Sequence, residues 1–142
     1  MMNSRIENRI GVQATSDRIW EVLADLEHWS RWNAYEAVEG RLAFHAPLQL
    51  AETFPGQPER HAVVSLNDWT PLNRLVWVER RGFLFNAVRY FEIDELNPGN
   101  CIFANGIQFT GLRGEWHYDK YRAALRPALE DIGEKMKALA EG

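Results

Sequence analysis

Three polar side chains lie in phase with apolar neighbours inside segments of strand-like sequence, and they are the residues of this chain best placed to do chemistry. Arg89 has the same parity as Phe91, and Glu52 and Asn105 alternate in the same way with apolar residues. Alternate residues of a strand face one side, so all three would point into the protein unless a bulge shifts the register. A buried polar group without a partner is costly, so an inward position requires a partner for each.

The guanidinium of Arg89 has two candidate partners. An arginine does not lose its proton inside a protein, so its charge must be matched. One match is a protein carboxylate, for which Glu52 is the candidate in phase. The other is an acidic group on a bound ligand, held by paired hydrogen bonds. In the second case Arg89 could also stabilise negative charge that develops during a reaction.

No other arrangement in the sequence predicts a catalytic or metal site. The four histidines lack the spacing of metal ligands, and no HExxH, CxxC, Gly-x-Ser-x-Gly or phosphate-binding glycine motif is present. Cys101 has no evident base nearby in the sequence. His61 begins a strand-like segment and could lie either at a pocket mouth or at an exposed strand end. We therefore assign no catalytic residue, metal ligand or cofactor.

The composition indicates one ordinary globular domain over residues 1–142. Hydrophobic residues make up 46% and charged residues 25% of the chain, and the net charge is −4. No basic cluster suggests nucleic acid as a partner. The start, MMNSRIENRIG, lacks the apolar run of a signal peptide, and no segment has the length of a membrane span. With a single cysteine, the chain is expected to be cytoplasmic and not to insert stably into a membrane.

The first 35 residues predict one strand and two short helices. Residues 5–14 read as a strand, and Ser16 is the expected N-cap of a helix that ends near Glu27. Trp29 and Trp32 follow in a second helical turn, where their spacing places both rings on one face. A pair of large rings at this point is expected to cap one end of the fold, through plain core packing or with Trp32 bordering a ligand.

Strands and one long helix fill the rest of the chain. Gly and Pro residues separate six strand-like segments at 41–45, 48–54, 61–69, 74–80, 84–95 and 101–110. Their short connections predict an antiparallel meander. An apolar stripe then predicts a helix over about 115–140, with a kink near Arg126 caused by Pro127. One helix about 10 Å wide cannot cover a flat sheet of seven strands, so the sheet must curl and leave a cavity.

Local motifs strengthen this element order. The stretch from Ala14 to Trp32, the segment WTPLNRLVW at 69–77, and Phe91-Glu92-Ile93 followed by NPGN and a strand from Cys101 all resemble the START/Bet v 1-like (SRPBCC) superfamily, the polyketide cyclase/dehydrase and lipid-transport group. Many members have proline after the Trp32-Asn33 pair, where this chain has Ala34. The resemblance implies an α+β helix-grip fold: a seven-stranded antiparallel curled sheet around a long C-terminal helix, with two short helices after strand 1.

The resemblance also implies a function in the cavity. The first hypothesis is binding of a mostly apolar small molecule, such as a lipid, polyketide or aromatic metabolite, in a cavity of roughly 300–1,000 Å³. The alternative is a cyclase/dehydratase-like enzyme with Arg89, Glu52 and His61 as acid–base candidates, and the third is a protein-interaction module. The predicted ligand-binding residues are Trp32, Phe54, Trp77, Phe85, Arg89, Phe91, Phe103, Asn105, Tyr121 and Leu125.

Overall fold

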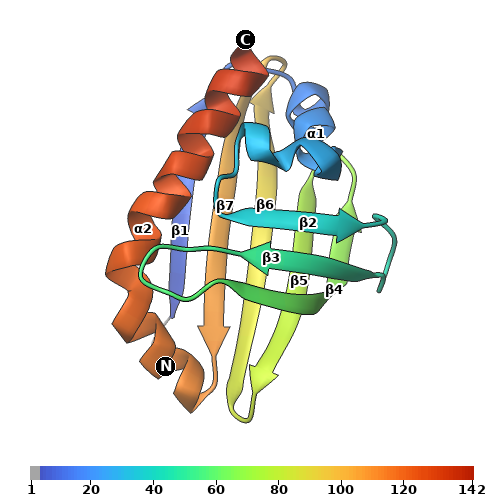
Figure 1. Cartoon of the computed structure of the whole chain (residues 1–142). Coiled ribbons are helices and arrows are strands. Elements are labelled where there is room, and N and C mark those ends of the chain that lie inside the picture. The colour runs from blue at the N-terminus through green and yellow to red at the C-terminus, as the bar shows by residue number, and fades with distance from the viewer. Residues whose placement is uncertain (1–3) are drawn as a thin grey trace.

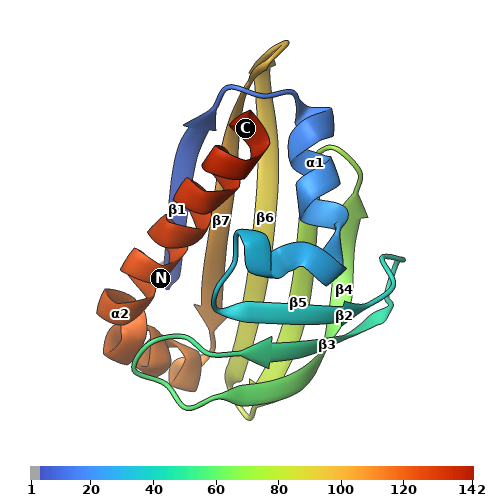
Figure 2. The same cartoon turned by 45° about the horizontal axis from the view of Figure 1, so that its top comes forward.

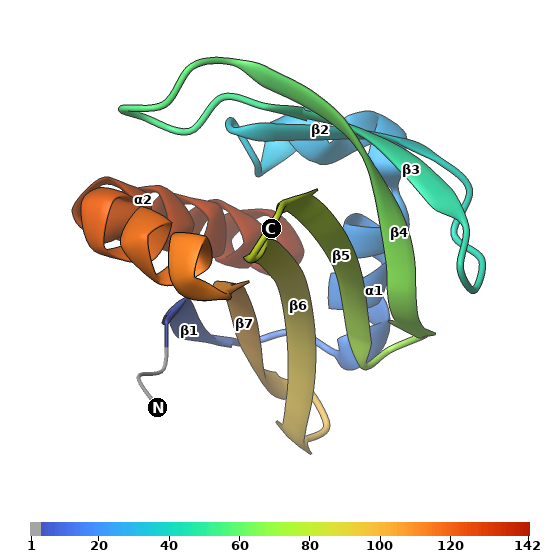
Figure 3. The ribbon, with the colours of Figure 1, turned by 90° about the horizontal axis from the view of Figure 1, so that it is seen from below.

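A seven-stranded antiparallel sheet is the central element of the computed structural model, which describes residues 4–142. The strands are β1 (Arg5–Val12), β2 (Glu36–Gly40), β3 (Pro47–Glu52), β4 (Arg60–Thr70), β5 (Arg74–Gly82), β6 (Phe85–Asn97) and β7 (Asn100–Thr110). Their order in the sheet is β1-β7-β6-β5-β4-β3-β2, so the first strand pairs with the last. Seen from below, the sheet curls around the long helix α2 (Leu112–Glu141), as predicted (Figure 3).

The alternation of side chains decides which face of each strand is buried. In β5, Leu75, Trp77 and Glu79 are buried, and in β3 the same holds for Leu48 and Glu52. Inward apolar residues gain free energy by leaving water, whereas inward carboxylates need partners. Five of the six predicted central strands are confirmed within about two residues at each end.

The predicted strand at 41–45 is wrong. This segment belongs to the connection between β2 and β3, and the strand lies just before it, at Glu36–Gly40. Gly40 has φ of 145° and His45 has φ of 58°, and these positive angles interrupt extended structure on both sides of the connection. Gly40 therefore ends one strand rather than preceding the next.

Two short helices lie across the face of the sheet that α2 also covers (Figure 2). Helix α1 spans Ser16–Ala24, and its N-cap is Thr15 rather than the expected Ser16: the Thr15 hydroxyl accepts a hydrogen bond from the Arg18 N–H at 3.1 Å. The helix ends three residues earlier than predicted. A 3₁₀ helix, η1 (Leu26–Arg31), follows and ends at Trp32.

Helix α2 packs its apolar stripe against the sheet, with Leu125, Leu129, Ile132 and Met136 buried as expected. Pro127 lies inside the helix, and the ribbon changes direction between its orange and red parts (Figure 1). This bend is the consequence expected of a missing backbone N–H. Among residues 4–142, no helix combines the length and apolar character that crossing a bilayer requires.

Five aromatic rings fill the closed end of the curled sheet. They are the buried side chains of Trp29, Trp32, Trp77, Phe91 and Phe103. Trp29 and Trp32 are neighbours, with ring centroids 4.9 Å apart, and the Trp29 indole N–H donates to the Leu23 carbonyl at 2.8 Å. Both rings pack into the core, as in the first of the two alternatives, and the role of the pair as a cap on one end of the fold stays a prediction.

Candidate functional site

Arg89 lies in the interior and forms a buried ion pair with Glu36. Both residues are 3% exposed. The Arg89 Nε–H donates to Glu36 Oε2 at 2.9 Å, and Nη2–H donates to Oε1 at 2.9 Å. The guanidinium also donates to the Gly106 carbonyl at 3.0 Å and stands 4.2 Å from the centroid of the Phe91 ring. The protein itself thus matches the charge of Arg89.

The inward parity predicted for Arg89 is confirmed, but its carboxylate partner is Glu36 and not Glu52. Glu36 belongs to β2, the strand that the sequence analysis placed five residues too late. Its parity with Val38, which is also buried, was the available signal. Because Glu36 supplies the negative charge, the structure gives no reason to place an acidic ligand group at Arg89.

Two asparagines complete this inner polar cluster. Asn33 donates to Glu36 Oε1 at 3.0 Å. Asn105, which is fully buried as its parity predicts, accepts from Arg89 Nη2 at 3.2 Å and donates to the Leu129 carbonyl at 3.2 Å. The Asn105 amide therefore links the sheet to α2. These partners satisfy the polar groups that burial would otherwise penalise.

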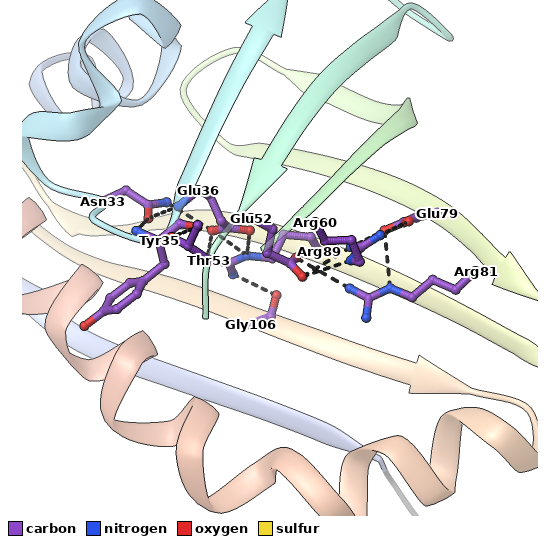
Figure 4. A network of polar contacts seen from close by, with 10 residues as sticks. All are labelled: Asn33, Tyr35, Glu36, Glu52, Thr53, Arg60, Glu79, Arg81, Arg89 and Gly106. Carbon is purple, nitrogen blue, oxygen red and sulfur yellow. Dashed lines mark hydrogen bonds and ion pairs between the residues drawn. The ribbon is translucent and has the colours of Figure 1, made fainter. Parts of the chain in front are cut away.

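A second cluster contains two carboxylates and two guanidiniums. Arg60 donates to Glu52 at 3.2 Å and also to both oxygens of Glu79, and Arg81 lies within 3.5 Å of Glu52 and 3.3 Å of Glu79. Figure 4 shows the inner cluster and this one following each other in a row across the interior. They meet where Glu36 and Glu52 stand opposite each other on β2 and β3. The four ionised groups of the second cluster balance to zero charge.

The two carboxyls of the second cluster differ in acidity. Burial raises the pKa of Glu52, and the opposing charges of Arg81 and Arg60 do not cancel it. Burial acts in the same direction on Glu79, but its hydrogen bonds and ion pairs with Arg60 and Arg81 outweigh it and lower the pKa. Glu52 is therefore the carboxyl of this pair that takes up a proton first as the pH falls.

A cavity of about 400 Å³ adjoins the second cluster, where α2 and the sheet diverge. Its volume falls in the predicted range, but it is partly open to solvent and also borders the connection between β3 and β4, so the predicted internal cavity stays a prediction. Charged groups of Arg60, Glu79 and Arg81 form one wall, and the rings of Phe85 and Tyr121 form another. The remaining lining residues are Gln57, Pro58, His61, Ala62, Arg80 and His117.

His117 is the feature of this cavity that the sequence analysis missed. Its ring packs against Phe85, Phe109 and Tyr121 with centroids 4.5–5.0 Å apart, and its Nε2 is buried without a hydrogen-bond partner. Burial, and then the charge of Arg81, lowers its pKa to about 4. The imidazole is therefore neutral at pH 7. The available signal was its place in α2, four residues before Tyr121 on the apolar stripe.

The structure brings only two of the ten predicted ligand-binding residues to the cavity, namely Phe85 and Tyr121. The other eight are buried in the core or in the inner polar cluster: Trp32, Phe54, Trp77, Arg89, Phe91, Phe103, Asn105 and Leu125. Those eight positions are buried because inward-facing rings meet one another and leave no open space between them. The assignment of all ten to ligand binding stays a prediction. His61 satisfies both alternatives, because it lies at the cavity mouth and its side chain is 71% exposed.

Two further features carry less chemistry. A larger hollow of about 680 Å³ lies between η1 and β2, outside the space between α2 and the sheet, and no unpaired buried side-chain group lines it. Burial raises the pKa of the Cys101 thiol, which makes it a poor nucleophile. Within the described range 4–142, no three His, Cys, Asp or Glu side chains gather as a metal site would need.

The architecture of this chain is similar to that of several solved structures. The chain superposes on the Zhui aromatase/cyclase from a Streptomyces species with a TM-score of 0.74 at 15% identity, covering 96% of this chain and 93% of that one. A START superfamily protein from Mycobacterium smegmatis matches with a TM-score of 0.63 at 17% identity, covering 93% and 98%. The chain has the helix-grip fold. The predicted resemblance is thereby confirmed at the level of fold, which is all that such identities show.

A third match is larger than this chain. The di-domain aromatase/cyclase StfQ of the steffimycin biosynthetic pathway matches with a TM-score of 0.73 at 15% identity, covering 97% of this chain. The chain spans about half of that protein, 51% of its length. The sequence matches no protein-family model and no curated protein.

Proposed function

We propose that the protein binds a small neutral molecule with an apolar body and at least one hydrogen-bonding group in the cavity at the N-terminal half of α2. The helix-grip fold is typical of proteins that bind hydrophobic ligands. The observation that carries the proposal is His117: this residue lines the cavity, and its buried Nε2 has no hydrogen-bond partner in the protein. A buried nitrogen without a partner costs free energy, and a ligand hydroxyl or carbonyl would supply the missing hydrogen bond.

The charges around the cavity favour a neutral ligand. The four ionised groups of the second cluster are already paired with one another, and the imidazole of His117 is neutral at pH 7. A ligand carboxylate would therefore find no unpaired cation in this cluster, and the remaining lining cation, Arg80, is exposed to water, where an ion pair contributes little. The rings of Phe85 and Tyr121 offer contact area to an aromatic or polyketide-like body.

A thermal-shift screen tests the proposal with matched ligands: hydroxylated aromatics, the same molecules without the hydroxyl, their carboxylates, and fatty acids. A ligand present at about 100 times its Kd should stabilise the fold by about 2.7 kcal/mol. His117→Phe should remove the preference for the hydroxylated member, worth about 1 kcal/mol, whereas His28→Phe on the exposed surface should not. If carboxylates stabilise more than neutral analogues, or His117→Phe leaves every affinity unchanged, the proposal is wrong.

A second candidate function is a cyclase/dehydratase-like reaction in the same cavity. It rests on the same imidazole, which is neutral at pH 7 and can accept a proton from a substrate, although a pKa of about 4 makes it a weak base. The comparison uses a poly-β-keto substrate analogue. An enzyme would convert it, and His117→Gln would lower kcat while substrate still binds. Binding without turnover by the parent protein supports the ligand-binding function alone.

A further inference from the structure

Four large apolar side chains are exposed around one end of the molecule, and we call them the apolar rim. They are Phe83 (74% exposed), Leu84 (44%), Leu112 (71%) and Trp116 (62%). The first two form the turn between β5 and β6, and the other two lie in the first turns of α2. The two segments touch, since the Arg113 N–H donates to the Leu84 carbonyl at 3.1 Å. Figures 1 and 3 show both segments at the same end of the sheet.

The rim borders the mouth of the cavity. Phe85, the residue after the turn, and His117, the residue after Trp116, both line the cavity. Each of the two segments of the rim is therefore next in the sequence to a residue that lines the cavity. A group of exposed apolar side chains on a protein surface often marks an interaction site.

The turn keeps its apolar side chains at a cost in backbone strain. Gly82 pairs with Phe85, which leaves Phe83 and Leu84 as a two-residue connection. Leu84 has φ of 57°, in the left-handed region where glycine or asparagine is normally found. A branched apolar residue there is strained by about 1 kcal/mol or more. Folding alone would favour a polar or glycine residue at this position.

Several backbone carbonyls of the rim already have hydrogen-bond partners within the protein. The Leu84 carbonyl accepts from the Arg113 N–H, and the Phe83 carbonyl accepts from the Arg113 guanidinium at 3.5 Å. The Gly111 carbonyl accepts from the Glu115 N–H at 2.9 Å. Unpaired backbone groups cannot enter a lipid phase without a large penalty. These pairs reduce that penalty by satisfying three carbonyls of the two segments.

We propose that the apolar rim docks reversibly on the surface of a lipid bilayer. The rim is carried by a two-residue turn and by the first turns of α2, and these can enter a deformable lipid interface without a complementary partner surface. The Lys120 ammonium lies 4.9 Å from the centroid of the Trp116 ring, so an apolar ring and a cation that prefers headgroups stand side by side. Such docking lies on the membrane and does not span it.

The charges near the rim predict a modest preference for anionic lipid. Arg80, Arg113 and Lys120 are exposed at this end, and Glu115 and Asp119 partly offset them. Apolar contact should therefore drive binding, with headgroup charge as a smaller contribution. Docked in this way, the cavity mouth would face the bilayer and could exchange a ligand with it. That exchange rests on the proposed function, whereas the docking itself needs no ligand.

Co-sedimentation with vesicles tests the docking directly. The probes are vesicles of phosphatidylcholine alone and of equal parts phosphatidylcholine and phosphatidylserine. The parent protein should sediment with both, somewhat more with the second. Phe83→Ser combined with Trp116→Ser should lower the vesicle affinity at least tenfold. The matched control is Phe44→Ser combined with Leu96→Ser, which removes two similarly exposed side chains, one from the β2–β3 connection and one near the end of β6, and should change little.

Fluorescence gives a second readout that does not depend on a folding-sensitive variant. Trp116 is the one exposed tryptophan among residues 4–142, so vesicles should shift its emission to the blue. Trp116→Phe should abolish the shift while sedimentation persists. The proposal is overturned if the parent protein does not sediment with either vesicle, or if the control pair loses as much affinity as the rim pair. It is also overturned if size-exclusion chromatography shows a dimer that Phe83→Ser dissociates, because a second copy would then cover the rim.

Discussion

Replacing Arg89 by methionine leaves the carboxylate of Glu36 buried without its guanidinium. Glu36 would keep only the Asn33 amide and its backbone contacts, at a position that is 3% exposed. Breaking a buried pair by removing one partner costs about 3–5 kcal/mol, because a charge is left uncompensated. We expect Arg89→Met to lower the free energy of unfolding by that amount. Glu36→Met should cost a similar amount, because it leaves the guanidinium unpaired.

The double variant, Arg89→Met with Glu36→Met, should be far less destabilised than the two single changes together. It removes both charges and leaves acceptors at Gly106 and Asn105 and a donor at Asn33 without partners. These neutral groups together cost about 1–3 kcal/mol. The coupling free energy between the two positions should therefore be about 3 kcal/mol or more.

Urea unfolding followed by tryptophan fluorescence measures all three variants against the parent chain, with the slope of each transition checked for constancy. Arg74→Met is the control, because the Arg74–Asp68 pair is exposed at 3.5 Å and should contribute less than about 1 kcal/mol. If Arg89→Met costs less than about 1 kcal/mol, or the two single effects simply add, then the pair does not hold the interior as described.

Three further outcomes are expected. Leu129→Ala, at a fully buried position of α2, should cost about 2–5 kcal/mol in urea unfolding, and a cost below about 1 kcal/mol would place the helix on the surface. The pKa of His117 is lowered to about 4 from an ordinary 6.5, so its contribution to stability is fully present above about pH 6.5 and declines as the pH falls towards 4. Since the ring is only half-buried, we expect about 1 kcal/mol lost by pH 5, and His117→Phe should remove that part of the decline relative to the parent; parallel profiles would contradict the assignment. Gly133→Ala should destabilise the parent, because the new Cβ would collide with Asn8 Oδ1. In an Asn8→Ala background the same change should instead stabilise the protein by about 1 kcal/mol, because alanine has the higher helix propensity. Thermal unfolding that showed the same sign in both backgrounds would rule out the collision.

The long periodic patterns of the sequence predicted most of the fold. The stripe that includes Leu125, Leu129 and Met136 determined the buried face of α2, and alternation located five central strands. Strand β2 was not predicted, because Val38 is its only large apolar residue and its sequence does not differ clearly from that of a loop. Its strand structure comes from pairing with β3, which is a tertiary contact and leaves little trace in the local sequence.

Parity also placed the polar side chains correctly but could not name their partners. Arg89, Glu52 and Asn105 all face inward. Which carboxylate pairs with which guanidinium depends on how far the sheet curls. The curl brings Glu36, on the edge strand β2, into contact with Arg89 on β6. For the same reason, the sequence does not show how much open space remains inside the curled sheet. Predicted lining residues such as Phe91 are covered by other rings, and whether inward faces meet is decided by packing in three dimensions.

The pairing of β1 with β7 has a consequence for how the chain acquires its structure. Arg5 stands opposite Gln108 and Val12 opposite Cys101, so partners in this ladder lie roughly a hundred positions apart along the chain. A nascent chain leaving the ribosome cannot close this part of the sheet until β7 has emerged, and the helix that covers the apolar face follows β7 in the chain. Contacts of such long sequence separation slow folding and leave apolar strands open to association in the meantime. A fragment ending before Leu112 should therefore lack cooperative thermal unfolding by circular dichroism, and this domain is expected to reach its native state only after α2 has been synthesised.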